Sequence, residues 1–347
     1  MREIKIADHP VGQGHSVFLI AEVAQAHDGS LGTAHAYIEA AAEAGADAVK
    51  FQTHIAAEES TLDEQFRVKF SRQDATRYDY WKRMEFSLEQ WEGLARHAKD
   101  KGLIFLSSAF SNAAVALLEK VGMPAWKVGS GEFRSMDMLS AMIKTGKPIL
   151  YSTGMSTWQE IDSVVHVLTA AGHPFALFQC TSQYPVPSAS VGLNVLDELR
   201  FRYQCPVGLS DHTGRVFAPL AAMACGADLV EVHITFDKGM FGPDVSSSVT
   251  VKEFALLARA RDEFHEMNTH PVDKDKMAEQ LAQMRELFSK SVAPAHALRA
   301  GEILTDADLV PRKPGTGVPY SEIHQLVGRR LTTDVAPDRL LRWEDIE

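Results

Sequence analysis

Short apolar runs recur between residues 18 and 234, and most of them end in polar side chains. The runs occupy residues 18–23, 48–52, 103–108, 125–132, 148–154, 175–181, 206–209 and 229–234. Short runs of this kind, bounded by glycine and polar residues, are typical of β-strands. We therefore predict eight strands. Side chains alternate between the two faces of a strand, so Lys50 and Gln52 share a face of the second one.

Helical segments separate the predicted strands. Gly29-Ser30 begins an alanine-rich helix that runs to Ala44, residues 159–171 form an amphipathic helix, and residues 251–267 supply the last one. Eight strand-then-helix units in succession predict an α/β fold, a parallel (β/α)8 TIM barrel with its helices outside. A doubly wound open sheet is the alternative, but its dinucleotide fingerprint, G-x-G-x-x-G after the first strand, is absent.

Two segments depart from this rhythm. Residues 56–84 are polar and aromatic, and we predict an enlarged loop after the second strand, over the mouth of the barrel. From residue 271 the pattern becomes charged and helical, and then short strands and turns dominate. We therefore predict a barrel over residues 1–270, a helical linker over 271–290, and a small mostly-β module over 291–347. A module of that size has a modest core, so we expect it to lean on a barrel.

The composition of the 347 residues narrows the class of protein. Hydrophobic residues make up 45% and charged residues 23%, which is ordinary for a globular protein. The net charge of −11 argues against a nucleic-acid partner, because no excess of Lys and Arg exists to replace its counterions. Three cysteines form no C-x-x-C pair and suggest no disulfide framework. We see no signal peptide and no apolar run that would span a membrane, and we expect a cytoplasmic location.

The chemistry of a barrel lies at the carboxyl ends of its strands. His212 and His233 follow or end the last two predicted strands, which lie about 5 Å apart if they are neighbours. The two histidines are therefore candidate ligands of one divalent ion. In the alternative interpretation, His233 is a hydrogen-bonded core histidine and His212 a turn residue.

Two lysines and several hydroxyl groups lie at the other predicted strand ends. Lys50 and Lys127, together with Ser130, Ser152 and Ser210, suit a small substrate that carries phosphate and carboxylate groups. Each serine alone is equally explained by a strand-end hydrogen bond. An inward-pointing lysine needs an anion, and Glu132 or Asp211 is a candidate partner, which would make part of the array structural.

Residue types alone therefore suggest a metal ion held by histidine, an anion held by lysine, and a spare carboxylate at Glu22. That combination indicates Lewis-acid activation of a carbonyl group beside a phosphorylated partner.

Seven strings along the chain resemble the sialic acid synthase family, which includes N-acetylneuraminate, legionaminic and pseudaminic acid synthases and related spore-coat polysaccharide proteins. The strings are Ile20-Ala21-Glu22, Val49-Lys50-Phe51-Gln52-Thr53-His54, Lys127-Val128-Gly129-Ser130-Gly131-Glu132, Ser152-Thr153-Gly154-Met155, Cys180-Thr181-Ser182-Gln183-Tyr184-Pro185, Gly208-Leu209-Ser210-Asp211-His212-Thr213 and Gly242-Pro243-Asp244. The tail resembles the family's C-terminal antifreeze-like module, the SAF domain. The resemblance covers nearly the whole chain in the right order.

The resemblance implies a reaction. The family condenses phosphoenolpyruvate with an N-acylated hexose, such as N-acetylmannosamine in its open-chain aldehyde form, to give a nine-carbon 2-keto acid and phosphate. Manganese or magnesium on His212 and His233 would polarise the aldehyde. Lys50 and Ser108 would face the carboxylate of phosphoenolpyruvate, and Glu22 would activate or orient the water that adds to it. The residues that would hold its phosphate are Lys127, Ser130, Ser152, Ser182 and Ser210.

The resemblance also implies contacts to the acceptor sugar and a homodimer. Gln52, Tyr184 and Asp244 would contact sugar hydroxyls, and Glu132 is a further candidate for substrate binding. In this family the module of one subunit caps the barrel of the other, so we expect exchanged tails. The family's arginine before the Pro-Gly of the capping loop is replaced by Lys313, with Arg312 preceding it, and either is a candidate contact to the acyl group. Ser182 stands where some members have asparagine.

Two other functions remain open from the sequence. One is a related 3-deoxy sugar acid synthase that uses another aldose, such as an aldose phosphate. The other is a non-catalytic scaffold whose module grips polysaccharide. Glu22, Lys50, Lys127, His212 and His233 together argue against the scaffold, since an inert barrel needs no cation pocket beside a metal pair.

Overall fold

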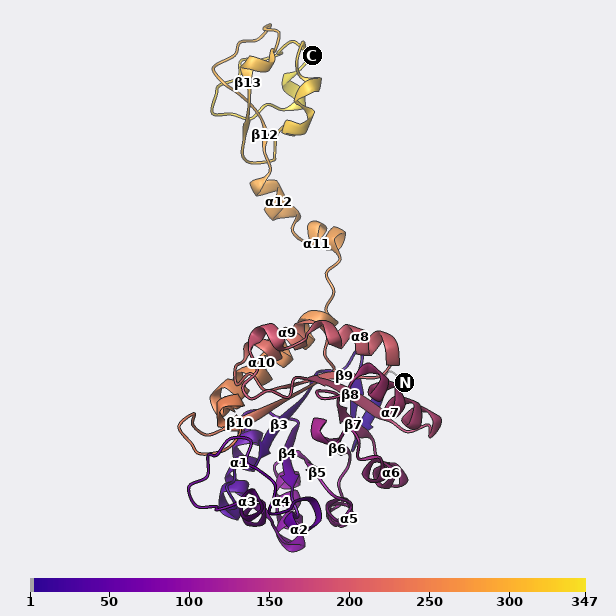
Figure 1. Cartoon of the computed structure of the whole chain (residues 1–347). Helices are drawn as coiled ribbons and strands as arrows, with labels where there is room; N and C mark the ends of the chain where they lie inside the picture. The colour runs from indigo at the N-terminus through magenta and orange to yellow at the C-terminus, as the bar shows by residue number, and fades with distance from the viewer. Residues whose placement is uncertain (1–2) are drawn as a thin grey trace. The chain divides into compact units, whose positions relative to one another are not determined.

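The apolar runs form eight parallel strands that close into a barrel in the computed structural model, which describes residues 3–347 (Figure 1). Each strand pairs with the next, and the last pairs with the first, with His233 beside Glu22. The strands are β3 (Phe18–Ala24), β4 (Ala48–Thr53), β5 (Ile104–Ala109), β6 (Trp126–Val128), β7 (Ile149–Ser152), β8 (Phe175–Cys180), β9 (Val207–Asp211) and β10 (Leu229–Thr235). The predicted TIM barrel is confirmed, and the open sheet is excluded.

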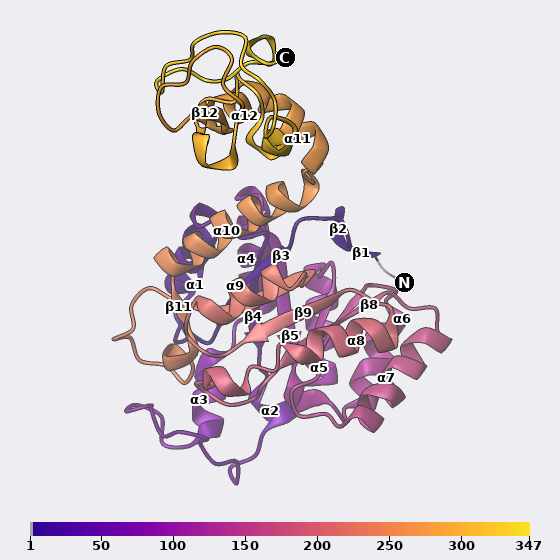
Figure 2. The same cartoon turned by 90° about the horizontal axis from the view of Figure 1, so that it is seen from above.

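The main helices lie outside the strands (Figures 1 and 2). They are α1 (Leu31–Glu43), α4 (Leu88–Asp100), α5 (Asn112–Val121), α6 (Met136–Lys144), α7 (Trp158–Ala170), α8 (Asn194–Tyr203), α9 (Phe217–Ala224) and α10 (Val251–Thr269). Side-chain caps fix where several begin. The Ser30 hydroxyl accepts a hydrogen bond from the Thr33 amide at the start of α1, and Thr157 and Glu160 form a capping box on α7. The predicted start of the first helix is therefore correct to within a residue.

Close packing between strands and helices forms the core of the barrel. Phe18, Val49, Trp126 and Leu177 are among the fully buried strand residues. Gly208 on β9 shows how tight the packing is, because a Cβ atom there would lie 2.6 Å from the Leu229 carbonyl oxygen and 2.8 Å from the Phe178 ring. A side chain at this position would push β9 away from β10 and open the barrel next to the strand ends.

Several elements differ from the sequence prediction. An antiparallel hairpin of β1 (Glu3–Ile6) and β2 (His9–Gly12) precedes the barrel and was not predicted. The predicted loop over residues 56–84 carries two helices, α2 (Ala56–Glu59) and α3 (Arg77–Met84). The fourth barrel strand ends at Val128, earlier than predicted. The remaining short elements of this unit are β11 (Val249–Thr250), η1 (Ser130–Glu132), η2 (Ser188–Ser190) and η3 (Val245–Ser247).

The chain divides after Thr269 into two compact units, and the second unit has its own small core. Val292, Val318 and Leu341 are fully buried there. The predicted linker folds into two short helices, and the Gly315 amide donates to the Glu286 carbonyl oxygen, 2.7 Å away, which ties the second helix to the module. The elements are α11 (Lys274–Gln280), α12 (Ala282–Phe288), the antiparallel β12 (Ser291–Pro294) and β13 (Leu309–Arg312), η4 (Asp306–Asp308), η5 (Tyr320–Gln325) and η6 (Trp343–Asp345).

Across residues 3–347, none of the helices combines the length and the apolar character that crossing a membrane requires.

Candidate active site

Most of the predicted site residues line one cavity of about 280 Å³ at the carboxyl ends of the barrel strands, here called the strand-end cavity. Catalytic and phosphate-binding groups of TIM barrels gather at this end. The predicted residues that line it are Glu22, Lys50, Gln52, Ser108, Lys127, Ser130, Ser152, Ser182, Tyr184, Ser210, His212 and His233. The predicted strand ends therefore converge, although they come from all parts of the first 235 residues.

Buried charges of alternating sign cross the floor of this cavity. Lys50 Nζ lies 2.7 Å from Glu22 Oε2 and 3.8 Å from Glu231 Oε2, and Lys127 Nζ lies 2.8 Å from Glu231 Oε1. The strand register brings these groups together, because Glu22 is the Cα partner of Lys50. The predicted lysine partners, Glu132 and Asp211, are wrong, because neither forms an ion pair with a lysine in the described residues.

Glu231 is thus the main residue that sequence reasoning missed. The signal was present, because Glu231 and His233 alternate on one strand and must share the inward face. Ser210 Oγ donates a further hydrogen bond to Glu231 Oε1 over 3.0 Å. Glu231 therefore holds both lysines and one predicted phosphate-binding hydroxyl in place.

The two carboxylates have different protonation behaviour. Burial raises the pKa of Glu22 to about 7, because it outweighs the attraction of Lys50. Burial acts in the same direction on Glu231, but Lys127 and Lys50 together outweigh it and lower the pKa of Glu231 to about 2. The ammonium of Lys50 is kept charged, since its pKa is raised by Glu22 and Glu231 against the effect of burial. Glu22 is therefore the carboxylate whose proton is exchangeable near neutral pH.

Hydroxyl groups surround the Lys127 side of the cavity. Ser130 Oγ and Ser182 Oγ hydrogen-bond to each other at 2.7 Å, and Ser108 Oγ accepts from Lys50 at 3.2 Å. Ser152 Oγ is buried and has no hydrogen-bond partner within residues 3–347. A buried hydroxyl without a partner is costly, and a bound anion would satisfy it.

The predicted metal ligands face each other, with ring centroids 5.4 Å apart. His212 Nδ1 donates to the Thr181 carbonyl oxygen at 3.2 Å, so its Nε2 carries the lone pair and accepts from the Tyr184 hydroxyl at 3.1 Å. Burial lowers the pKa of His212 to about 4 and that of His233 well below its usual value. Both rings are therefore neutral, the form that binds metal.

The two histidines fit a metal ion only as an open site, in which the protein supplies some of the ligands and leaves the other positions free. No group of three or more His, Cys, Asp or Glu side chains placed to hold a metal occurs in the part of the chain that the structure describes. Two imidazole nitrogens supply only part of a coordination shell, so substrate oxygens or waters would complete it. An ion on His212 would displace the Tyr184 hydroxyl.

A second cavity of about 330 Å³, here called the loop cavity, shares several lining residues with the first, among them Gln52, Arg67, Tyr184 and His233. It also contains the predicted residues Glu132 and Asp244. Residues of the 56–84 segment form its wall, and Arg67 spans it, with Nη2 3.0 Å from Asp244 Oδ1 and the guanidinium 4.2 Å from the Tyr184 ring centre. Sequence reasoning did not assign Arg67, because nothing along the chain shows which loop residue crosses the barrel mouth.

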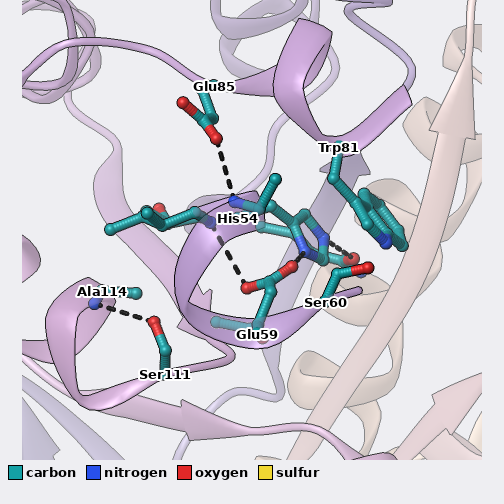
Figure 3. A network of polar contacts seen from close by, with 12 residues as sticks. His54, Glu59, Ser60, Trp81, Glu85, Ser111 and Ala114 are labelled. Atoms are coloured by element: carbon teal, nitrogen blue, oxygen red, sulfur yellow. Dashed lines mark hydrogen bonds and ion pairs between the residues drawn. The ribbon is translucent and has the colours of Figure 1, made fainter. Parts of the chain in front are cut away.

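His54 forms part of this wall in a defined orientation (Figure 3). Its ring stacks between Trp81 and Phe110, with centroids 3.8 Å and 4.3 Å away. Nδ1 donates a hydrogen bond to Glu59, and Gln25 Nε2 donates to Nε2 at 2.7 Å. The stacking and the polar contacts leave His54 little freedom to turn, so it forms a rigid side of the cavity.

The last two predicted site residues, Arg312 and Lys313, belong to the second unit and make their contacts within it. Arg312 Nη1 donates to the Pro337 carbonyl oxygen at 2.5 Å, and Lys313 Nζ lies 4.6 Å from the centre of the Phe288 ring. Their predicted contact with a sugar stays a prediction.

Comparison with known proteins adds an independent line of observation. Residues 37–272 match the model of the NeuB family, and residues 289–347 match that of the SAF domain. The chain is 31% identical to the N,N'-diacetyllegionaminic acid synthase of Campylobacter jejuni, over 93% of this chain and 98% of that protein. It is 32% identical to the human N-acetylneuraminate-9-phosphate synthase, over 97% and 94% of the two chains.

A solved structure with a similar fold is the N-acetylneuraminic acid synthetase of Leptospira borgpetersenii serovar Hardjo-bovis, crystallised with citrate. Its TM-score is 0.71 at 26% identity, and the similarity covers 82% of this chain and 97% of that one. The strings that carry the resemblance in the sequence are thus supported by overall similarity in sequence and in fold.

Proposed function

Because the chain belongs to the NeuB family and ends in a SAF domain, we propose that it condenses phosphoenolpyruvate with an N-acylated hexose to give a nine-carbon 2-keto sugar acid and phosphate. Relatives with this family match are synthases of legionaminic, pseudaminic and neuraminic acids, so the coarser assignment is a phosphoenolpyruvate-dependent sugar acid synthase, a transferase. The observation that carries the finer proposal is the buried lysine and hydroxyl array beside two neutral histidines.

Phosphoenolpyruvate has two anionic ends, and the strand-end cavity has a lysine for each. Lys127 with Ser130, Ser152, Ser182 and Ser210 holds the phosphate, and Lys50 with Ser108 faces the carboxylate. The unpartnered Ser152 hydroxyl and the Ser130–Ser182 pair support the phosphate position, because both offer O–H groups to an incoming oxyanion. Glu231 balances the two lysines when the cavity holds no anion.

The bond changes assign a role to Glu22. Carbon 3 of the enol forms a bond to the aldehyde carbon of the hexose, and the aldehyde oxygen takes up a proton and becomes a hydroxyl. Water adds at carbon 2, and phosphate leaves by C–O cleavage. The incoming water loses a proton, and Glu22 is the carboxylate in the cavity whose raised pKa suits it to accept one. Lys50 keeps the Glu22 carboxylate oriented through their 2.7 Å contact.

His212 and His233 are the residues that would hold manganese or magnesium, and such an ion would polarise the aldehyde oxygen. The support is the pair of neutral, facing rings. The hydrogen bond from His212 Nδ1 to Thr181 fixes the tautomer that presents Nε2 to an ion. Gln52, Tyr184, Asp244 and Glu132 line the space where the hexose would lie.

We also propose a homodimer with exchanged C-terminal modules. The helices α11 and α12, with Leu281 between them, carry exposed apolar side chains, here called the exposed stripe: Met277, Leu281, Met284 and Phe288. Within α12, Met284 and Phe288 are four residues apart and share a face. Exposed stripes of this kind favour burial against another surface. A second copy of the chain is the partner that module exchange would supply.

The test measures phosphate release with phosphoenolpyruvate, Mn²⁺ and candidate acceptors. We expect release only when phosphoenolpyruvate, an N-acylated hexose and the ion are all present, and none with arabinose 5-phosphate. Lys127→Met should remove release while circular dichroism stays unchanged. Release that persists without any sugar, or that requires an unacylated aldose phosphate, would contradict the proposal.

A separate measurement, of Mn²⁺ binding, tests the assignment of His212 and His233 as metal ligands. His233→Ala should abolish Mn²⁺ binding followed by electron paramagnetic resonance, with the fold intact. Substitution of His173, a buried histidine that bonds the Lys147 carbonyl oxygen away from both cavities, serves as the control. Unchanged Mn²⁺ affinity in His233→Ala would refute the assignment.

A further inference from the structure

A row of hydrogen bonds leads from the Glu22 carboxylate to the helix α2. Gln52 Nε2 donates to Glu22 Oε1 at 2.9 Å, and Gln25 Nε2 donates to Gln52 Oε1 at 2.5 Å. The same nitrogen of Gln25 also donates to His54 Nε2, 2.7 Å away. At the far end, His54 Nδ1 donates to Glu59 (Figure 3). The four side chains that lead to Glu22 are here called the hydrogen-bond chain: Gln52, Gln25, His54 and Glu59.

The direction of every link in the hydrogen-bond chain is determined. The Glu59 carboxylate accepts from Nδ1 of His54, so the lone pair of the neutral ring is on Nε2. Gln25 therefore meets this ring with its NH2 group, and its second N–H points at the Gln52 carbonyl oxygen. Gln52 is left with its own NH2 group toward Glu22. A flip of either amide would bring two donors or two acceptors together, so the chain ends on Glu22 with a donor.

A β-bulge in β3 brings Gln25 next to Gln52. Glu22 pairs with Lys50 but Ala24 pairs with Phe51, so β3 contains one extra residue between two successive pairs. Because side chains alternate along a strand, an unbulged strand would point the side chains at positions 22 and 25 to opposite faces. Ala24 has a φ of +47°, a left-handed conformation that is unfavourable for alanine. Strained backbone of this kind is concentrated at functional sites.

The outer part of the hydrogen-bond chain is nearly closed to water. The side chains of His54 and Glu59 are 4% and 8% exposed, and Gln25 is 4% exposed. A buried polar group that loses its partner pays the cost of desolvation, because water cannot replace that partner. Each of these side chains therefore holds the next in one orientation.

We propose that Gln25 is a positioning residue for Glu22, which it orients through Gln52 with the rest of the hydrogen-bond chain as its anchor. The inference rests on the proposed function, in which Glu22 accepts a proton from the incoming water. Lys50 contacts carboxylate oxygen Oε2, and the chain contacts Oε1. A carboxylate held at both oxygens keeps one orientation toward the reacting carbon and still has lone pairs free for the water.

The first experiment measures phosphate release by the full-length enzyme with phosphoenolpyruvate and Mn²⁺. The acceptors are N-acetylmannosamine and 2,4-diacetamido-2,4,6-trideoxymannose. Gln25→Met replaces the amide with a side chain of similar length that cannot donate. We expect kcat with the better acceptor to fall about tenfold, while KM for phosphoenolpyruvate stays within about twofold.

Three results of this experiment are distinguishable. A fall in kcat supports the inference. An unchanged kcat, or a change confined to KM for the acceptor, would overturn the inference and leave the proposed function standing. No release by the wild type with either acceptor would overturn both.

Two glutamates at the start of α2 separate the orientation of the hydrogen-bond chain from the stability of the helix. Glu59 accepts from the Ile55 amide at 3.3 Å, and Glu85 accepts from the Ala56 amide at 2.9 Å. Only Glu59 also contacts His54 (Figure 3). We expect Glu59→Ala to lower kcat about tenfold and Glu85→Ala to leave it within about twofold. Equal losses would show that anchoring of α2 is the cause, and would overturn the inference.

A double variant tests whether the side chains act as one unit. His54→Phe keeps an aromatic ring between Trp81 and Phe110 but removes the acceptor for Gln25. Changes that break one chain at two points have effects that do not multiply. Gln25→Met combined with His54→Phe should therefore have the kcat of the slower single variant. A combined loss of about 100-fold, the product of two independent effects, would overturn the inference.

Discussion

Glu22 and Glu231 are buried on neighbouring strands, and their neighbours move their pKa values in opposite directions. Glu231 lies between the ammonium groups of Lys50 and Lys127, which keep it ionised. Glu22 contacts only Lys50, and burial has the larger effect on its pKa. One carboxylate therefore serves as a fixed counter-charge and the other as a group that can gain and lose a proton.

This difference predicts a pH dependence. The role proposed for Glu22 requires its ionised form, and its raised pKa means that this form is populated only as the pH rises. We expect kcat/KM for the acceptor to increase through about pH 7 and then level off. Glu22→Gln should reduce kcat by at least about 100-fold and remove this limb of the profile. A pH profile of Glu22→Gln parallel to that of the wild type would contradict the role.

The counter-charge role of Glu231 predicts a loss of stability. Glu231→Ala leaves Lys127 buried without a carboxylate, and we expect the free energy of unfolding in urea to fall by about 3 kcal/mol. The double change Lys127→Met and Glu231→Leu should recover much of that loss, because no charge is then left unpaired. Glu39→Ala, which removes an exposed carboxylate partner of Lys101, should change stability far less. Equal effects of the two single changes would argue against the assignment.

The lysine partners also show the limit of sequence reasoning at this scale. The alternation of Lys50 and Gln52 predicted that they share a face of the strand, and both line the strand-end cavity. The choice of Glu132 and Asp211 as lysine partners failed because it rested on carboxylates near predicted strand ends, without the order and register of the strands. Ion pairs across a barrel depend on strand order and register, and Lys127 finds its partner 104 residues away.

Among the elements, the segment from α2 to α3 was the hardest to predict. Buried strands are recognised by unbroken apolar runs. The helix α3 has the polar sequence RYDYWKRM, which shows no clear apolar periodicity. The signal that was available is the capping box of Thr76 and Asp79. The β1–β2 hairpin was missed for a related reason, because strands of four residues carry too little pattern.

This segment is fastened to the barrel through Arg83 at the end of α3. Its guanidinium contacts Asp74 Oδ2 and Asp28 Oδ1, each at 2.7 Å, and the Asp28 carbonyl oxygen at the same distance. Hydrogen bonds from Arg83 lower the pKa of Asp74. Asp74 therefore stabilises the segment above its unfolded pKa of about 3.9, and that stabilisation is lost as the pH falls through its lower folded value.

We expect Asp74→Asn to lower the hydrogen-exchange protection of residues 60–76 at neutral pH. The difference between wild type and variant should disappear as the pH is lowered and Asp74 of the wild type takes up its proton. Mass spectrometry of peptides from this segment measures both. Asp63→Asn, at an exposed position in the same segment, is the matched control and should have no effect. A difference that persists at low pH would show that Asp74 acts other than by its charge.

At the scale of the whole molecule, the exposed stripe on α11 and α12 predicts an assembly. Sedimentation velocity should give the mass of two 38.2 kDa chains. Leu281→Lys with Met284→Lys should weaken association, because both side chains are about half exposed in the single chain and a charge there would oppose their burial against a second copy. Gln283→Lys, beside the stripe on α12, should not. A monomer at micromolar concentration would remove the support for module exchange.

The pairing of β3 with β10 determines when the barrel can close during synthesis. Phe18 on β3 pairs with Leu229 on β10. β3 is the first barrel strand to be synthesised, and it gains its second neighbouring strand only after β10, the last one, has been made. Contacts between such distant parts of a chain form slowly. Lys50 and Lys127 likewise remain without Glu231 until that strand is synthesised. We therefore expect the lysines of the nascent chain to stay hydrated until the barrel closes, because a lysine buried without its carboxylate partner would be unstable.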